Sequence, residues 1–279
     1  MSFILDMLKV ILLGIVEGIT EWLPISSTGH MLLVDQFCKL SQPEEFKEMF
    51  FVVIQLGAII AVVIMFWKKM WPFVKKDDSK LSLDMNIMRT WFKVIVACIP
   101  SAVLGLFLDD WLEAHFGGPV SIAIMLIVYG VAFIVVENWN KTREPRIEKL
   151  SSIDYKTAFI IGLFQVLSMI PGTSRSGATI IGALIIGVSR TAAAEFTFFL
   201  AVPTMLGASA LKLVKYGFHY NFGQIVILLF GMIVAFIVSL FCVRWLMNFI
   251  KKHDFKVFGW YRIALGALVI LLACFGVFA

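Results

Sequence analysis

Charged residues are scarce in this sequence. Only 15% of its 279 residues are Asp, Glu, Lys or Arg, whereas 60% are hydrophobic. A water-soluble domain of this length needs far more polar surface, so the composition predicts an integral membrane protein. The net charge of +5 does not indicate nucleic-acid binding, because the Lys and Arg residues fall in short connections between apolar runs.

Several familiar motifs are also missing. The chain has no Walker phosphate loop, no GxGxxG and no CxxC pair, so ATP-driven transport and redox chemistry have no support. The N-terminal apolar run lacks a small-residue cleavage site, and we expect it to be retained. Without metal-ligand spacing, the four cysteines are expected to be buried free thiols. They are Cys38, Cys98, Cys242 and Cys274.

Apolar runs predict six membrane-spanning helices. They are expected at residues 49–67, 94–108, 119–136, 196–214, 224–243 and 260–279. The loops 68–93 and 137–156 are basic, and so is the last inner loop, to which we assign Arg244, Lys251 and Arg262. The positive-inside rule places these three loops on the cytoplasmic side.

Two further pairs of apolar pieces contain segments too short to cross a bilayer. The first pair is 3–23 and 31–37, and the second is 157–170 and 178–188. Each pair flanks a polar loop, which must be buried in protein or line a wet cavity. We therefore expect two re-entrant helix pairs.

The two halves of the chain align at a constant offset of 147 residues. The aligned residues are Pro24 with Pro171, Ser26 with Thr173, Ser27 with Ser174, Glu48 with Glu195 and Phe51 with Phe198. Because each half has an odd number of spanning helices, the second half must be inverted. The sequence thus predicts an all-α membrane protein with an inverted-topology repeat, whose two polar loops meet near mid-depth in one site. Residues 1–140 form the first repeat, 141–156 a cytoplasmic linker and 157–279 the second repeat.

The first polar loop lies within EGITEWLPISSTGH, Glu17 to His30. Glu17 and Glu21 are four residues apart, on one helix face, where they could exchange a proton or bind a divalent cation. Ser26, Ser27 and Thr28 supply hydroxyl groups at the start of the next helix, which favours anion binding. His30 could deprotonate a hydroxyl or water, or attack phosphorus itself.

The second polar loop is PGTSRSG, Pro171 to Gly177. It offers another helix start with the hydroxyl groups of Thr173, Ser174 and Ser176, and adds the guanidinium of Arg175, the side chain best matched to phosphate oxygens. Helix packing and capping account for isolated Ser, Thr and Gly residues in membranes, but not for Arg175 and His30. Together the loops predict a site for a phosphorylated lipid or an anionic solute.

These two motifs closely resemble the signature regions of the bacterial undecaprenyl-diphosphate phosphatases, the bacitracin-resistance family. The resemblance covers nearly the whole chain, including Phe50 to Trp67 and Glu195 to Pro203. It implies hydrolysis of undecaprenyl diphosphate to undecaprenyl phosphate, the lipid carrier of cell-wall precursors. It also implies a bacterial plasma (inner) membrane location, with the site open to the outer face.

The resemblance further implies roles for individual residues. The catalytic group would be Glu17, Glu21, Ser27, His30 and Arg175, and the phosphate-cradling neighbours Ser26, Thr28, Thr173, Ser174 and Ser176. A divalent cation, Mg²⁺ or Ca²⁺, is a family trait, with Glu17 and Glu21 as candidate ligands. Ser27 is the favoured nucleophile, while phospho-His30 and direct attack by water stay open as alternatives.

Two other functions compete with hydrolysis. Inverted repeats with broken helices are also a design of secondary transporters, so a lipid flippase is the first alternative. A non-catalytic lipid-binding partner is the second, although it gives the Glu, Ser, His and Arg set no role. The oligomeric state, a homodimer included, is left open by the sequence.

Overall fold

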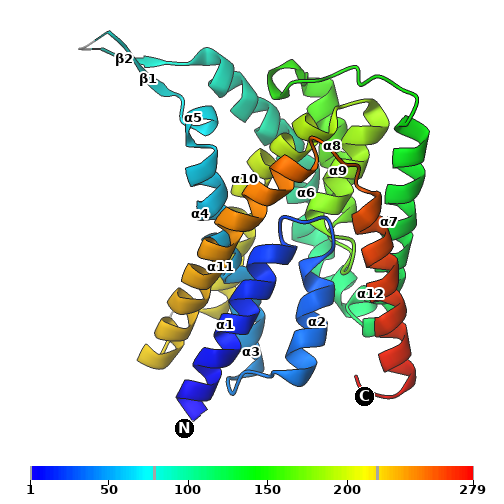
Figure 1. Ribbon diagram of the computed structural model, residues 1–279. Helices are drawn as coiled ribbons and strands as arrows, with labels where there is room; N and C mark the ends of the chain where they lie inside the picture. Colours follow the sequence, from blue (N-terminus) through cyan, green and yellow to red (C-terminus); the bar gives the residue numbers. More distant parts are fainter. Residues whose placement is uncertain (1, 78–79, 218–219, 279) are drawn as a thin grey trace.

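The protein is a bundle of helices in a computed structural model that describes residues 2–77, 80–217 and 220–278 (Figure 1). The helices are α1 Ser2–Thr20, α2 Ser27–Phe37, α3 Glu44–Val53, α4 Gln55–Met65, α5 Trp67–Met70, α6 Met85–Phe116, α7 Pro119–Asn140, α8 Tyr155–Leu167, α9 Arg175–Ile186, α10 Arg190–Tyr216, α11 Phe222–Phe249 and α12 Lys256–Cys274, with a short 3₁₀ turn at Leu150–Ser152. The predicted all-α class is confirmed.

Six helical segments in the described part of the chain are long and apolar enough to cross a membrane, as predicted. They are Glu44–Met65, Met85–Phe116, Pro119–Asn140, Arg190–Tyr216, Phe222–Phe249 and Lys256–Cys274. The first of them consists of α3 and α4, which meet at Ile54.

Helix boundaries differ from the apolar runs that predicted them. The run 94–108 belongs to α6, a helix of 32 residues that begins after Asp84, whose side chain accepts hydrogen bonds from the amides of Asn86 and Ile87. Such a cap fixes the start of a helix well outside its apolar part. At the other end of the chain α12 stops at Cys274, short of the predicted 279.

The basic segment 68–93 contains a small antiparallel hairpin that the sequence did not predict. Strand β1 is Phe73–Asp77 and strand β2 is Lys80–Leu83, with Phe73 opposite Leu83. Lys75, Lys76 and Lys80, which helped to mark this loop as basic, have side chains outside the described part of the structure. The hairpin projects from one end of the bundle (Figure 1).

The helices pack closely through small residues. In α4 a Cβ on Gly57 would lie 2.0 Å from the carbonyl oxygen of Met232 in α11, and in α8 one on Gly162 would lie 2.3 Å from that of Ala97 in α6. Neither position can hold a larger residue without moving a helix. In a membrane the hydrophobic effect does not drive helices together, because lipid tails are as apolar as the helices. Close backbone packing through small residues stabilises their association instead.

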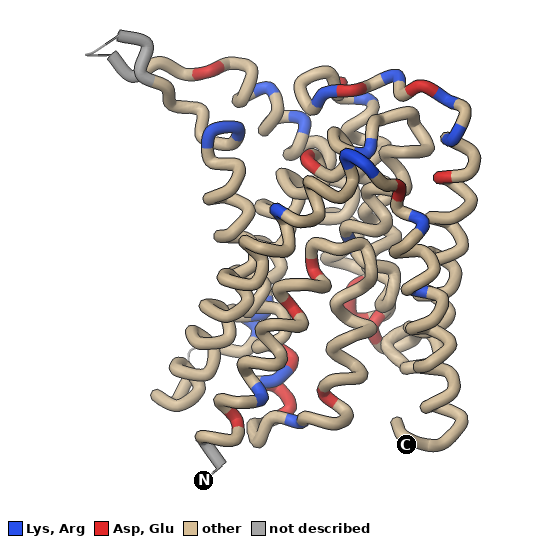
Figure 2. Tube along the Cα trace, in the orientation of Figure 1, with Lys and Arg blue, Asp and Glu red and all other residues tan. Residues whose placement is uncertain are grey.

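Lys and Arg residues are concentrated at the end of the bundle that carries the hairpin and the α7–α8 connection (Figure 2). The N-terminus and the end of α12 lie at the opposite end (Figure 1). All four cysteines are free, as predicted, but only Cys242 is buried. Cys274 is exposed because it belongs to the last turn of α12, at the rim of the bundle.

Candidate active site

The first polar loop folds into a turn between α1 and α2. Ser26 caps α2 from a backbone conformation with φ 73° and ψ 102°, and its Oγ accepts a hydrogen bond from the amide of Gly29 at 3.3 Å. A positive φ is uncommon for a residue with a side chain and persists only where the surroundings impose it. The turn therefore aims the first amides of α2 in a fixed direction.

The second polar loop repeats this geometry between α8 and α9. Ser174 caps α9 with φ 72° and ψ 124°, and its Oγ accepts from the amide of Gly177 at 3.2 Å. Within the described residues, Ser26 and Ser174 are the two with positive φ that are not glycine. They are 148 residues apart, so the predicted equivalence of Ser26 with Thr173 is shifted by one residue. The reason is that the second loop has one more residue between its proline and its cap.

Glu21 joins the two loops. Its Oε1 accepts a hydrogen bond from Nη2 of Arg175 at 3.1 Å, and its Oε2 accepts one from the Oγ of Ser27 at 2.9 Å. The side chains of Arg175 and Glu21 are 10% and 8% exposed. Shielding from water strengthens such a pair, and Ser27 has a carboxylate placed to take its proton.

Three buried polar atoms of predicted site residues lack a hydrogen-bond partner within the described structure. They are Oε1 of Glu17, Oγ1 of Thr173 and Nε of Arg175. A buried polar atom without a partner costs free energy, and a catalytic role or a bound water or ion is the usual explanation for one in a native structure. Nε of Arg175 is a donor, Oε1 of Glu17 is an acceptor, and Oγ1 of Thr173 can be either. A ligand with oxygen atoms and a coordinated cation would require both kinds of group.

His30 is held by two groups, neither of which is Ser27. Its Nδ1 donates to the carbonyl oxygen of Ser26 at 2.7 Å, so its Nε2 accepts from the Tyr261 hydroxyl at 2.8 Å. The two rings are stacked with centroids 5.6 Å apart. In this arrangement the partner of the Ser27 hydroxyl is Glu21, and the His30 lone pair is occupied.

The other predicted phosphate neighbours have different surroundings. Ser176 is buried and its Oγ donates toward the carbonyl oxygens of Glu21 and Leu23, at 3.3 and 3.4 Å. These contacts tie the second loop to the first. Thr28, by contrast, is exposed in the first turn of α2, where its hydroxyl is open to a ligand.

Arg262 is the residue that the sequence analysis misplaced. We assigned it to a cytoplasmic loop, but it lies in α12 and is fully buried. Its guanidinium donates to the carbonyl oxygens of Pro24 in the first loop, at 3.2 Å, and of Gly172 and Thr173 in the second, both at 2.9 Å. The assignment was wrong because the positive-inside rule counts Arg residues near helix ends, and the sequence did not reveal that α12 begins at Lys256, before Arg262.

Tyr261 was also missed. It precedes Arg262, contacts His30 and is exposed. The available signal was an Arg next to a Tyr in an apolar run. An ionisable residue indicates a functional site only if it lies inside a membrane segment, so this signal required knowledge of where the helix begins.

The carboxylates could hold a divalent cation only with help from a ligand. The described residues contain no group of three or more His, Cys, Asp or Glu suited to a metal ion. Glu17 and Glu21 supply two carboxylates one helical turn apart, and Oε1 of Glu17 is free of other bonds. This fits the habit of Mg²⁺, which is commonly bound by one or two carboxylates together with phosphate oxygens of a substrate.

The fold and these contacts define a class: a multi-pass membrane protein with a carboxylate, a hydroxyl and a guanidinium at the meeting point of two helix N-termini, suited to an anionic group. Comparison with known proteins gives the family. The profile described as "Bacitracin resistance protein BacA" matches residues 10–268, and the chain belongs to this family.

Curated relatives agree along nearly the full length. The chain is 66% identical over 268 residues to an undecaprenyl-diphosphatase of Enterococcus faecalis, covering 96% of this chain and 97% of the relative. It is 59% identical over 269 residues to an undecaprenyl-diphosphatase of Desulfitobacterium hafniense, covering 96% of each. An undecaprenyl-diphosphatase of Streptococcus pyogenes is 53% identical over 276 residues, 98% of each chain.

Proposed function

We propose that this protein is an undecaprenyl-diphosphatase, which hydrolyses undecaprenyl diphosphate to undecaprenyl phosphate and inorganic phosphate. The proposal extends the activity named in its relatives to this chain. By recycling the lipid carrier of peptidoglycan precursors, the enzyme would confer bacitracin resistance, the property in the family's name. The observation that carries the proposal is Glu21, which binds Ser27 and Arg175 from two different loops.

The contacts suggest how the reaction begins. Arg175 and the amides at the N-termini of α2 and α9 bind the diphosphate and stabilise the charge on the transferring phosphoryl group. Ser27 Oγ attacks the terminal phosphorus while its proton passes to Glu21. The bond from that phosphorus to the bridging oxygen breaks, and Glu21 gives the proton to this oxygen as undecaprenyl phosphate leaves.

Water completes the cycle. It attacks the phosphoserine at Ser27, Glu21 takes its proton, and the same proton returns to Ser27 Oγ as inorganic phosphate is released. Attack by His30 has less support, because Nε2 is engaged with Tyr261 and Nδ1 with Ser26. A Mg²⁺ or Ca²⁺ ion, held by Glu17, Glu21 and the diphosphate, would neutralise phosphate charge.

We further propose that residues 1–140 and 157–279 are inverted repeats joined by the linker 141–156, and that α1–α2 and α8–α9 are re-entrant pairs. The shared cap geometry of Ser26 and Ser174 supports this.

The site would open to the outer face, away from the basic end of the bundle in Figure 2. Thr28 in α2 and Tyr261 in α12 are both exposed, so the lipid would enter between these helices. A homodimer is compatible with this arrangement and is tested by light scattering in detergent.

The deciding experiment measures inorganic phosphate release from undecaprenyl diphosphate by purified protein in detergent, with Mg²⁺ and then with a chelator. We expect release by the wild-type protein and its loss in Glu21→Gln. Glu45→Gln, which removes an exposed carboxylate at the start of α3, is the matched control and should be unaffected. Binding of the lipid without phosphate release under any metal condition would overturn the proposal and favour a lipid flippase.

A further inference from the structure

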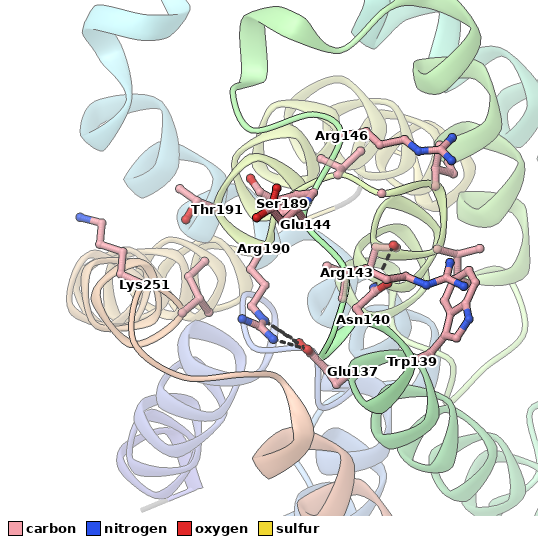
Figure 3. A pocket seen from close by; sticks show the side chains of 17 residues that line it. Glu137, Trp139, Asn140, Arg143, Glu144, Arg146, Ser189, Arg190, Thr191 and Lys251 are labelled. Carbon is pink, nitrogen blue, oxygen red and sulfur yellow. Dashed lines mark hydrogen bonds and ion pairs between the residues drawn. The ribbon is translucent and has the colours of Figure 1, made fainter.

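A cavity lies away from the candidate active site. It has a volume of about 830 Å³ and forms where the end of α7, the α9–α10 connection and the end of α11 come together (Figure 3). None of the residues of the two polar loops lines it. It lies among the basic segments that we assign to the cytoplasmic side.

The walls of this cavity carry a net positive charge. Its charged residues are Glu137, Arg143, Glu144, Arg146, Arg190 and Lys251. Glu137 is buried and already satisfied, because it binds Arg190 through contacts of 2.9, 3.2 and 2.5 Å and accepts from the amide of Phe255 at 3.0 Å. Within the described residues, Arg190 with Glu137 is the only ion pair of the cavity wall. The wall therefore carries three further cations, Arg143, Arg146 and Lys251, and one further carboxylate, that of the exposed Glu144.

Arg143 is positioned by an aromatic ring instead of a carboxylate. Its guanidinium carbon lies 3.7 Å from the centre of the Trp139 ring (Figure 3). A cation held in this way keeps its charge and most of its hydrogen-bond donors for another partner. Trp is also the side chain that typically lies at the boundary between membrane and water, so a position of Arg143 at head-group level fits this pairing.

Backbone amides add to the positive potential. The first turn of α10, at Arg190 and Thr191, lines the cavity. Ser189 caps this turn by accepting from the amide of Ala192 at 3.2 Å, and the first intrahelical bond runs from the amide of Ala193 to Ser189. The amides of Arg190 and Thr191 precede that bond, at the positive end of a helix of 27 residues.

The remaining wall is apolar. Leu184, Ile185 and Ile186 from the end of α9 line it together with Val188 in the α9–α10 connection and Ile250 after α11. A soluble anion such as free phosphate would leave this surface without a partner. An amphipathic anion would use both walls, its phosphate on the cations and its glycerol and first methylenes on the apolar side.

We propose that this cavity binds the head group of an anionic phospholipid from the cytoplasmic leaflet. Its phosphate would bind among Arg143, Arg146 and the first turn of α10. Such a lipid would hold α7, α10 and α11 together at the end of the bundle opposite the catalytic opening. The inference concerns binding and does not depend on the protein being a phosphatase.

The test is a lipid titration monitored by native mass spectrometry and thermal stability. Delipidated protein in detergent is titrated with phosphatidylglycerol, with zwitterionic phosphatidylcholine, and with soluble glycerol 3-phosphate. We expect phosphatidylglycerol to remain bound and to raise the unfolding temperature, whereas the other two do neither. An equal shift with glycerol 3-phosphate would make the ligand a soluble anion and overturn the lipid assignment.

Charge-matched variants locate the site. Arg143→Gln with Arg146→Gln removes two charges from the cavity, whereas Lys141→Gln with Lys156→Gln removes two from nearby exposed positions outside it. At about 1 kcal/mol per basic residue, the first pair should weaken phosphatidylglycerol binding roughly 30-fold and the second far less. Equal weakening by both pairs would mean a diffuse surface effect and would overturn the proposal. If the first pair fails to fold, Lys251→Gln alone should weaken binding about fivefold, and unchanged binding would count against the site.

Discussion

The hydroxyl of Ser27 and the carboxylate of Glu21 face each other across the turn between α1 and α2, with 2.9 Å between Oγ and Oε2. They are six positions apart in the chain. The contact depends on the turn at Ser26 reversing the chain, so that the last part of one helix lies against the first turn of the next.

We expect Ser27→Ala to lower phosphate release more than about 100-fold, because the chain then lacks both the nucleophile and the proton that Glu21 receives. Steady-state kinetics in detergent measure the loss. Rapid acid quench with radiolabelled substrate should trap acid-stable phosphoserine in the wild-type protein. Full activity of the Ser27→Ala variant would instead favour direct attack by water or by His30.

Arg175→Lys keeps the charge of the second loop but loses the planar donor set that binds Glu21 and the carbonyl oxygen of Thr197. We expect kcat/KM to fall by about 10²–10³, the range seen when one charge-stabilising donor is removed. Arg244→Lys, at an exposed position of α11, is the control. Equal kinetics for the two variants would exclude a charge-stabilising role for Arg175.

Arg262→Lys tests whether the buried guanidinium sets the distance between the loops. A lysine cannot reach Pro24, Gly172 and Thr173 together, so the loops should separate slightly, and a displacement of about 1 Å can cost roughly 100-fold in rate. We expect kcat to fall with little change in the affinity for a non-hydrolysable diphosphate analogue, and the unfolding temperature to drop. A purely structural role would lower stability while leaving kcat of the folded fraction intact.

Tyr261→Phe distinguishes between roles for His30. The variant keeps the stacked ring but removes the hydroxyl that donates to Nε2. If His30 only positions the first loop, losing one neutral hydrogen bond should lower activity less than about tenfold. If His30 attacks phosphorus, freeing Nε2 should raise the rate and yield acid-labile phosphohistidine. Phosphoenzyme trapping separates these outcomes.

Much of the fold could be predicted because the bilayer imposes simple rules. The six long helices are recognisable from apolar length alone, and family membership follows from two long polar motifs. Helix ends were less predictable, since caps such as Asp84 place polar residues inside a helix. Strands β1 and β2 lie in a segment without a long apolar run, so apolar length did not predict them.

The sequence selected several residues that the structure brings together, but it did not predict their hydrogen-bond partners. The sequence named Glu21, Ser27 and Arg175, yet assigned His30 a reactive role beside Ser27, whereas the structure pairs it with Ser26 and Tyr261. Ser176 was expected to face phosphate, but its hydroxyl is turned toward the backbone of the first loop. Hydrogen-bond partners depend on side-chain directions that residue spacing does not specify.

The sequence by itself determined the membrane class, the number of long apolar helices, the family and the chemical groups of the two loops, because apolar length and motif identity are local properties of the chain. Only the tertiary structure decided that Glu21 connects both loops, that Arg262 lies beneath them and that the basic end of the bundle encloses a cavity. These relationships join residues far apart in the chain, 154 positions for Glu21 and Arg175 and 90 for Arg262 and Gly172, and they exist only once the helices have packed.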